Sequence, residues 1–289
     1  MNELLSALKV SCFTNLLEAY CEARIEITAV IDGGAGWGET AHRMLQACPQ
    51  IRTCYAFEPF PGNYRFFESA DARIVLHRQA LANRNGVVKF EVPSVVQEGS
   101  AWGARGLVGY SSGGSLKVMG RPGALTIDVE CVRADDVVAP GETIGFIKLD
   151  LQGGEADALD GMSALLGEVE FLWVEYLGDP ALCDKLSELG FMLFDTKYVF
   201  RGEPSPDALE AFDVAYTTTA STGDFRWHGY KKQRWSNFKE EFIFCKKRFN
   251  LIQTDIVAVN KRKLKNFTKA LSFLEPGVPT YNPPSAVMK

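Results

Sequence analysis

The chain has 289 residues, of which 46% are hydrophobic and 23% charged, so it can bury a sizeable core and is not disordered by composition. Its formal net charge is -5, and a mildly acidic chain without a basic stripe is a poor candidate for duplex nucleic-acid binding. We therefore expect a globular protein that has no nucleic-acid partner.

The cysteines and the N-terminal residues indicate where the protein works. The seven cysteines are scattered and contain no CxxC pair, which is typical of free thiols in a reducing compartment. The first residues lack the pattern of a signal peptide, and no apolar run reaches the ~18 residues of a membrane span. We expect a cytoplasmic protein with no membrane partner.

The first part of the chain predicts one βαβ unit preceded by a helix. Apolar residues recur at helical spacing over about residues 3–23, and we expect this amphipathic helix to pack on the domain that follows. In chain order we then predict a strand over residues 27–32, a helix over 36–48, a strand over 52–58, a short helix over 63–70 and a strand over 73–77.

The pattern changes after the third strand. Residues 87–92 and 125–132 alternate between apolar and polar side chains, as antiparallel strands do, and we predict an insertion over about 85–132. Between these strands, residues 98–123 contain eight glycines. A loop of this length in a compact domain is usually functional or disordered. We predict a mobile cover over a site, with disorder as the alternative.

Parallel-sheet signals then resume. We predict strands over residues 144–150, 171–175, 191–194 and 242–245, with helices over 155–166 and 181–189. Strands that alternate with helices indicate an α/β domain with a mainly parallel sheet. The signal weakens after about residue 250. The predicted divisions are an N-terminal helix over 1–24, the main domain over 25–250 and a C-terminal tail over 251–289.

Three acidic residues stand at the predicted C-terminal ends of buried strands, namely Asp32, Glu58 and Asp150. In an open parallel sheet, ligands bind outside these ends, although any one acid can instead cap the next helix. Glu58 follows Gly38 by 20 residues, which is where nucleoside sites place the carboxylate that accepts both ribose hydroxyls.

The glycine turn after the first strand separates two cofactor classes. Residues 34–38 follow G-x-G-x-G, whereas a dinucleotide site requires G-x-G-x-x-G with a helix N-terminus aimed at a pyrophosphate. Asp32 would oppose a pyrophosphate but can accept from an ammonium group. The cofactor that fits has a ribose, an amino-acid moiety and no phosphate, which describes S-adenosylmethionine. The alternative is an ordinary strand–turn–helix connection.

The stretches 32–38, 57–59 and 147–155 resemble the three motifs of the FkbM-type methyltransferases, and the resemblance spans roughly residues 27–245. It implies an α/β, Rossmann-like class I methyltransferase fold, with a mainly parallel seven-stranded sheet, helices on both faces and a β-hairpin and loop insertion. It also implies S-adenosylmethionine as cofactor and methylation of hydroxyl oxygens on sugars or natural products. Gly33, Trp37 and Gln152 depart from the residues that are common in this family.

The resemblance assigns cofactor roles to particular positions. The turn beneath the cofactor is Gly34, Ala35 and Gly36; Asp32 holds the turn or the methionine amine; Glu58 binds the ribose; Gln79 and Ala80 edge the adenine; and Asp150 faces the methionine moiety or the nucleophile.

An alcohol acceptor must lose its proton to a general base near the methyl group. Asp150 is the first candidate, Glu175 the second and His77 the third, although each has a plausible structural role as well. Lys148 is either an ion-pair partner of Glu155 or Glu175, or a group that orients the acceptor. We predict no metal site, because no His or Cys cluster is present and no spacing forces Asp150, Glu155 and Glu175 to converge.

The sequence therefore predicts an S-adenosylmethionine-dependent methyltransferase acting on a hydroxyl of a carbohydrate or secondary metabolite, with a small molecule or glycan as acceptor. A non-catalytic binding module of the same fold is the alternative, and a nicotinamide-dependent oxidoreductase is disfavoured by the glycine spacing. We expect acceptor specificity to lie in residues 98–123 and 220–237, including the aromatic and basic cluster at 225–235. Neither the acceptor nor the oligomeric state follows from the sequence.

Overall fold

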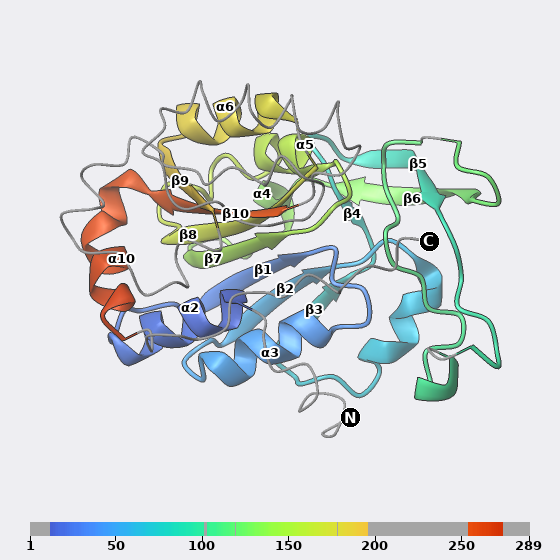
Figure 1. Ribbon diagram of the computed structural model, residues 1–289, viewed down its shortest axis with the longest axis horizontal. Helices are drawn as coiled ribbons and strands as arrows, with labels where there is room; N and C mark the ends of the chain where they lie inside the picture. Colours follow the sequence, from blue (N-terminus) through green and yellow to red (C-terminus); the bar gives the residue numbers. More distant parts are fainter. Residues whose placement is uncertain (1–11, 101–102, 119, 178, 196–253, 274–289) are drawn as a thin grey trace, which may run out of the picture. The chain divides into compact units, whose positions relative to one another are not determined.

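The computed structural model describes residues 12–100, 103–118, 120–177, 179–195 and 254–273. Its main sheet has seven strands in the order β3-β2-β1-β7-β8-β10-β9, and among the pairings described only that of β9 with β10 is antiparallel (Figure 1). This arrangement confirms the predicted α/β fold class. The chain divides into two compact units, one of residues 27–175 and one of residues 1–26 together with 176–289.

The unit of residues 27–175 contains the parallel part of the sheet. Its strands are β1 (Ala29–Gly33), β2 (Thr53–Phe57), β3 (Ile74–His77), β7 (Ile144–Leu149) and β8 (Phe171–Tyr176, whose last residue belongs to the other unit). Its helices are α3 (Glu39–Ala47), η1 (Pro61–Phe67), α4 (Ala134–Val137) and α5 (Glu155–Asp160). All residues of β1, β7 and β8 are buried, as expected for strands covered on both faces.

The direction of the crossovers explains where the strands end. From β1 the chain passes through α3 to β2 on one side, and from β7 it passes through α5 to β8 on the other. Right-handed crossovers in opposite directions put α3 and α5 on opposite faces of the sheet (Figure 1). Because the five strands are parallel, their carboxyl ends meet at one edge, where the order reverses between β1 and β7.

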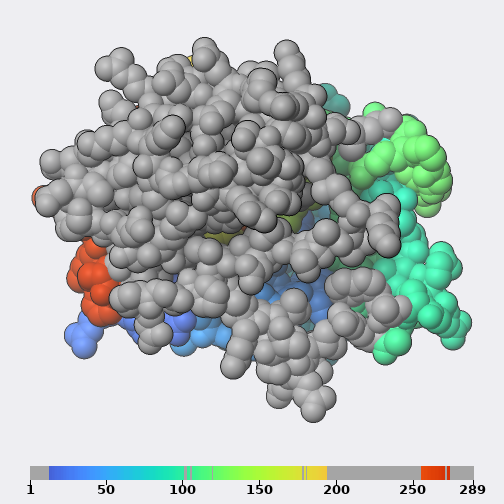
Figure 2. All heavy atoms as spheres, viewed as in Figure 1, coloured from blue at the N-terminus to red at the C-terminus, as the bar shows by residue number. Residues whose placement is uncertain are grey.

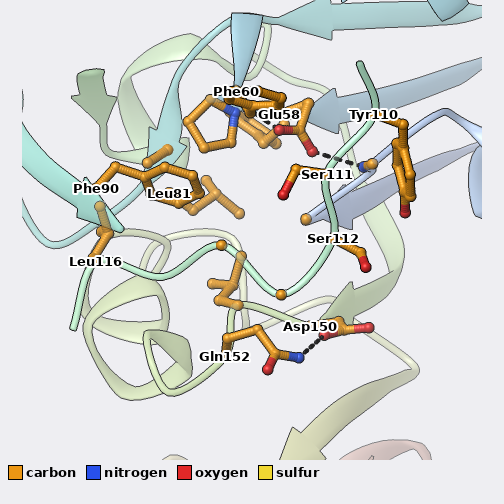
Figure 3. Close-up of a pocket in the computed structure, with 18 residues that line it drawn as sticks. Glu58, Phe60, Leu81, Phe90, Tyr110, Ser111, Ser112, Leu116, Asp150 and Gln152 are labelled. Carbon is orange, nitrogen blue, oxygen red and sulfur yellow. Dashed lines mark hydrogen bonds between the residues drawn. The ribbon is translucent and has the colours of Figure 1, made fainter. Parts of the chain in front are cut away.

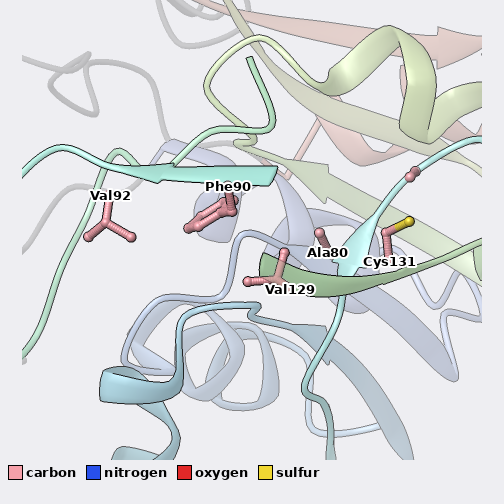
Figure 4. Close-up of a cluster of buried hydrophobic side chains, with 6 residues drawn as sticks. Ala80, Phe90, Val92, Val129 and Cys131 are labelled. Atoms are coloured by element: carbon pink, nitrogen blue, oxygen red, sulfur yellow. The ribbon is translucent and has the colours of Figure 1, made fainter. Parts of the chain in front are cut away.

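A smaller sheet in the same unit has the order β4-β6-β5, with β4 at Ala80–Leu81, β5 at Gly86–Val92 and β6 at Leu125–Val132. Strands β5 and β6 pair antiparallel over their whole length, which confirms the predicted hairpin. Its buried side chains, with Phe90 and Val129 facing Ala80, form a separate small core (Figure 4). The hairpin and the described part of the segment that links its strands, which includes η2 (Gly103–Arg105), are green in Figure 2.

The other unit combines α2 (Cys12–Glu22) with α6 (Pro180–Glu188), β9 (Phe191–Asp195), β10 (Thr254–Asn260), η3 (Lys261–Lys263) and α10 (Leu264–Leu271). Strands β9 and β10 pair antiparallel. Helix α2 packs against α10, and both bury apolar side chains, such as Leu16 and Phe267. The described part of the predicted N-terminal amphipathic helix is confirmed.

Two expectations about elements need correction. The helix predicted over 155–166 ends at Asp160, and Gly161 after it packs so closely on the chain that a Cβ there would lie 1.9 Å from the Ala82 carbonyl oxygen. The C-terminal tail predicted over 251–289 is wrong for residues 254–271. These residues form β10, η3 and α10, which the weak sequence pattern after residue 250 did not reveal. The predicted strand at 242–245 and the aromatic and basic cluster at 225–235 lie outside the described residues.

Candidate functional site

The turn that follows β1 is built from glycines in the left-handed backbone region. Their φ angles are 76° at Gly34, 58° at Gly36 and 83° at Gly38. The Gly34 N–H donates to the Phe57 carbonyl at the end of β2, over 3.1 Å. A Cβ on Gly34 would lie 2.1 Å from the Asp150 carbonyl oxygen at the end of β7, so only glycine fits there. The turn therefore lies between the ends of β2 and β7, the two strands that flank β1.

Glu58 follows β2 and is held by the backbone. Its Oε2 accepts from the Gly36 N–H and its Oε1 from the Phe60 N–H, each over 2.8 Å (Figure 3). The residue is only 5% exposed, and it lines a cavity. Burial raises the pKa of Glu58 to about 7, although hydrogen bonds from Phe60, Gly36 and Asn63 oppose the shift. Each carboxylate oxygen therefore has one fixed donor and retains capacity to accept from a ligand.

Asp150 follows β7 and lies beside a buried ion pair. Pairing of β1 with β7 puts Asp32 opposite Lys148. The Lys148 Nζ lies 3.5 Å from Asp32 Oδ1 and 3.5 Å from Asp150 Oδ2, and it donates to the Gly34 carbonyl over 3.4 Å. Asp32 is fully buried, and burial raises its pKa while Lys148 opposes the rise. Lys148 thus joins the end of β7 to the end of β1.

Gln152 connects Asp150 to Glu175 at the end of β8. The Gln152 Nε2 donates to Asp150 Oδ1 over 3.0 Å and to both oxygens of Glu175 over 2.9 Å. The Asp150 side chain is 45% exposed, and it opens on the cavity. Burial by surrounding protein raises the pKa of Asp150, but the charge of Lys148 and the hydrogen bonds with Gln152 and Glu175 outweigh it, so the net pKa lies below the ordinary value.

Residues 103–118, here named the cover segment, pass over this edge of the sheet. The amide of Asn63 in η1 donates to the Ser111 carbonyl over 3.0 Å and accepts from the Ser111 N–H over 3.1 Å. The Tyr110 ring packs edge-on against Trp37 and Phe66, with centroids 6.4 and 6.1 Å away. Burial raises the pKa of Tyr110 to about 12, so its hydroxyl stays protonated at neutral pH.

Between the strand ends and the cover segment lies a cavity of about 280 Å³, near the lower end of the ~300–1,000 Å³ usual for small-molecule sites. Figure 3 shows an apolar side, with Phe60, Leu81, Phe90 and Leu116, and a polar side at Asp150 and Gln152. The residues that line it are Gly34, Gly36, Phe57, Glu58, Pro59, Phe60, Ala80, Leu81, Phe90, Tyr110, Ser111, Ser112, Gly113, Gly114, Leu116, Asp150, Leu151 and Gln152.

The cavity brings together part of the set of residues assigned from the sequence. The assigned residues that line it are Gly34, Gly36, Glu58, Ala80 and Asp150. Those that lie behind its wall are Asp32, Ala35, Lys148 and Glu175, all of them buried. Gln79 points elsewhere, because its Nε2 donates to Glu130 on β6 over 3.3 Å on the exposed side.

His77, the third candidate for the base, sits in an aromatic stack. Its ring lies 4.7 Å from the Phe57 ring and 5.9 Å from the Tyr55 ring. Burial lowers its pKa, and it does not line the cavity. This environment gives His77 a packing role in the sheet.

Sequence reasoning missed most of the cavity wall. Phe60, Leu81 and Phe90 come from irregular segments or from the small sheet, where no periodic pattern marks a ligand-facing side chain. Tyr110 and Ser111 fall within the predicted cover, so their segment was found but their individual roles were not. Pro59 after Glu58 and the Gly113–Gly114 pair were the available signals of close backbone approach.

Two general features of the described residues concern metal binding and membrane insertion. No group of three or more His, Cys, Asp and Glu side chains there has the arrangement of a metal site. No helix in that part of the chain is long and apolar enough to cross a membrane.

Comparison with known proteins adds a family match. The model of the Methyltransferase FkbM domain matches residues 21–192. The 2-O-methyltransferase NoeI of Sinorhizobium fredii (strain NBRC 101917 / NGR234) is 28% identical over 152 residues, covering 51% of this chain and 62% of that protein. The chain thus spans less than two thirds of this curated relative.

Solved structures with similar chains include two methyltransferases. One is methyltransferase FkbM from Methylobacillus flagellatus KT, with 16% identity, a TM-score of 0.34 and coverage of 52% of this chain and 32% of that chain. The other is precorrin-6y C5,15-methyltransferase from Geobacter metallireducens GS-15, with 8% identity, a TM-score of 0.39 and coverage of 86% and 87%.

Proposed function

We propose a methyl-transfer function for this chain, which belongs to the FkbM methyltransferase domain family. The family match confirms the resemblance drawn from the sequence and S-adenosylmethionine as the cofactor. We propose further that the methyl group goes to a hydroxyl oxygen of a carbohydrate or secondary metabolite. Asp150 is the proposed general base, and Glu58 the proposed ribose ligand.

The geometry of Glu58 carries the proposal. A carboxylate whose two oxygens each accept one backbone N–H, and which faces a cavity, is prepared to accept two more hydrogen bonds from a cis-diol. Its position just after β2, beside the turn that follows β1, is where nucleoside sites hold a ribose. Two of the donors are backbone groups, which fix the orientation of the carboxylate more firmly than flexible side chains would.

The rest of the cavity fits the remaining parts of the cofactor. The apolar side, with Phe60, Leu81 and Phe90, suits an adenine ring, and Ala80 leaves space at its edge. The carboxylate of Asp150 lies on the polar side, where a cationic methionine moiety would be favoured. When bound, S-adenosylmethionine supplies a methyl group on a positively charged sulfur.

Asp150 is the residue that would take the proton in this reaction. It would accept the proton of the acceptor hydroxyl, whose oxygen would receive the methyl group supplied by S-adenosylmethionine, with S-adenosylhomocysteine as the leaving product. The side chain opens on the cavity and its pKa is lowered, so it is ionised at neutral pH. Its low pKa makes Asp150 a weak base, so alignment of the acceptor must supply much of the rate.

Two observations bear on the competing functions. A relative that is named a 2-O-methyltransferase supports oxygen as the receiving atom. Glu39 in the first turn of α3 would repel a pyrophosphate at that helix end, which disfavours a dinucleotide and hence the oxidoreductase. The non-catalytic module differs from the enzyme only in acceptor chemistry.

Calorimetry with S-adenosylhomocysteine and with NAD tests the cofactor assignment. We expect binding of the first only, and a loss of affinity in Glu58→Ala. Retention of full affinity in that variant would remove Glu58 from the site. Methyl-transfer assays across sugars and other hydroxylated acceptors then separate the enzyme from the module, with Asp150→Asn as the inactive control. Product identified as an N- or C-methyl compound would overturn the oxygen assignment.

A further inference from the structure

We propose that Gln152 is a positioning residue that joins the side chain of Asp150 to that of Glu175, ties this pair to the cover segment and so holds Asp150 ionised and in place to receive a proton. The proposal rests on the proposed methyl transfer, in which Asp150 must be free to receive a proton. It assigns to Gln152 a part in setting the pH range of the reaction, beyond filling the cavity wall. Three features of the structure support it.

The first feature is the use of one amide group by two acids. Carboxylates only accept hydrogen bonds, so Asp150 and Glu175 cannot bond to one another unless one of them is protonated. The Gln152 Nε2 carries two N–H groups and donates to Asp150 over 3.0 Å and to both Glu175 oxygens over 2.9 Å. The amide thereby favours the ionised form of Asp150 without adding charge, alongside a hydrogen bond between Asp150 and Glu175. A protonated Asp150 could not act as the base.

The second feature is the backbone of Gln152, which is fixed from two directions. Its φ is 54°, in the left-handed region that a non-glycine residue seldom adopts. Its carbonyl accepts from the Ser115 hydroxyl of the cover segment over 2.8 Å, and the same hydroxyl accepts from the Lys117 N–H over 2.9 Å. The side-chain amide is therefore aimed at the two acids by a backbone that the cover segment helps to hold.

The third feature is the charge around Asp150 on every side. Lys148 on β7 lies 3.5 Å away, and Asp32 on β1 is the other partner of that lysine. The neighbouring acid Glu155 on α5 is occupied by the Leu151 and Gly153 N–H groups, over 2.8 and 3.2 Å. Tyr110 faces the site as a neutral phenol, and the Lys117 chain lies over Gly153. With several acids crowded around one buried cation, the uncharged donor of Gln152 helps Lys148 to keep Asp150 ionised.

The test replaces the amide by the isosteric acid. Gln152→Glu puts a third acceptor where two donors stood, so a proton has to be shared among the three carboxyls. The readout is the ¹³C NMR titration of aspartate carboxyls, with the Asp150 signal identified by its loss in Asp150→Asn. We expect this signal to titrate about one pH unit or more higher in Gln152→Glu than in the unchanged protein. Gln46→Glu, on the exposed side of α3, is the matched control and should leave it in place.

The same variants are then assayed for methyl transfer as a function of pH. The acidic limb of kcat should move to higher pH in Gln152→Glu, while the affinity for S-adenosylhomocysteine changes less than about threefold. Gln152→Ala removes the donors without adding an acid and serves if Gln152→Glu does not fold; it should move the Asp150 titration upward by a smaller amount. An Asp150 titration that is unchanged in both variants overturns the role of Gln152. A protein without methyl transfer whose Asp150 signal nevertheless shifts contradicts the proposed function and leaves the pairing by Gln152 standing.

Discussion

Two carboxylates that occupy equivalent positions in the fold differ in almost every physical respect. Glu58 follows β2 and Asp150 follows β7, and both line one cavity. Glu58 is 5% exposed and its described partners are neutral, so burial raises its pKa to about 7. Asp150 has a side chain 45% exposed beside Lys148, and its pKa is lowered. Both carboxylates stand at the end of a parallel strand, and the groups around each one determine its pKa and the role that we propose for it.

The partners of the two acids explain this division. Backbone N–H groups hold Glu58 in one orientation, which suits a recognition role that must not vary from one turnover to the next. Side chains hold Asp150, namely Lys148 and Gln152, and these can adjust when a proton arrives. We expect substitutions at Glu58 to act on binding and substitutions at Asp150 to act on turnover.

The strongest test of this contrast is Asp150→Asn. The amide cannot take the proton of the acceptor, so kcat should fall by about 10²- to 10⁴-fold, the usual contribution of a general base. The affinity for S-adenosylhomocysteine should change far less. Steady-state kinetics and calorimetry on the same preparation measure both quantities. Asp128→Asn, which removes a carboxylate from an exposed ion pair with Lys89 on the hairpin, should leave both unchanged.

An Asp150→Asn enzyme that keeps its turnover would remove Asp150 as the base and leave Glu175, held by the same amide, as the next residue to test. A variant that loses binding and turnover together would instead make Asp150 a cofactor ligand, and the contrast with Glu58 would disappear.

The close contact between Gly34 and the backbone of Asp150 gives a second prediction. In Gly34→Ala the new methyl group would lie 2.1 Å from the Asp150 carbonyl oxygen, and φ is already 76°. We expect the free energy of unfolding to fall by about 2–4 kcal/mol. Gly141→Ala has a φ of 83° but nothing within 4 Å, so it should cost only about 1–2 kcal/mol. Equal losses in denaturant titrations would show that the close approach to Asp150 has no energetic weight.

The edge of the sheet was predictable from sequence because two simple rules apply to it. A mainly apolar run followed by an acid marks a buried strand and its end, and parallel strands bring those ends together. Asp32, Glu58 and Asp150 were located in this way. The strand β10 was missed because its short run of apolar residues, 256–259, lies where the sequence signal weakens after about residue 250.

Strand registers and the contacts made by loops could not be predicted from the same rules. That Lys148 lies beside Asp32 follows from the pairing of β1 with β7, which depends on strand order and register rather than on local sequence. Gln79 was assigned to the adenine edge, but the pairing of β4 with β6 brings it to Glu130 instead. Ser111 and Leu116 reach the cavity through contacts of an irregular segment, for which sequence periodicity carries no information.

A third prediction concerns Glu58, the proposed ribose ligand. An ionised Glu58 is the form that accepts two ribose hydroxyls, and its pKa of about 7 means that the free protein loses this form as the pH falls. Affinity for S-adenosylhomocysteine should therefore weaken by up to about tenfold per pH unit below about pH 7 and level off above it. Glu58→Gln should bind about 10- to 100-fold more weakly at pH 8 and show no such dependence.

Calorimetry between pH 5.5 and 8.5 measures both effects for Glu58. Because the titrating group is then an amide, any dependence on pH that survives in Glu58→Gln belongs to another residue. Glu130→Gln, on the exposed side of β6, is the matched control and should bind like the unchanged protein.

The smallest effect on binding is expected where the cover segment meets Glu58. Asn63 is 1% exposed, its amide exchanges two hydrogen bonds with the Ser111 backbone, and it also helps to stabilise the ionised Glu58. Asn63→Ala should lower the free energy of unfolding by about 1–3 kcal/mol, because buried polar groups of Ser111 lose their partners. Asn83→Ala, which removes only an exposed hydrogen bond to Asp157, should cost less than about 0.5 kcal/mol.

In Asn63→Ala the affinity for S-adenosylhomocysteine should fall only a few-fold, because the two backbone donors of Glu58 remain. The pH at which binding weakens should nevertheless move above that of the unchanged protein, since one group that favours the charged carboxylate is gone. The acidic limb of the pH profile of kcat, which we assign to Asp150, should remain at the same pH. A joint movement of both pH profiles would mean that the cover segment couples the two carboxylates, and that they are not the independent sites their separate partners imply.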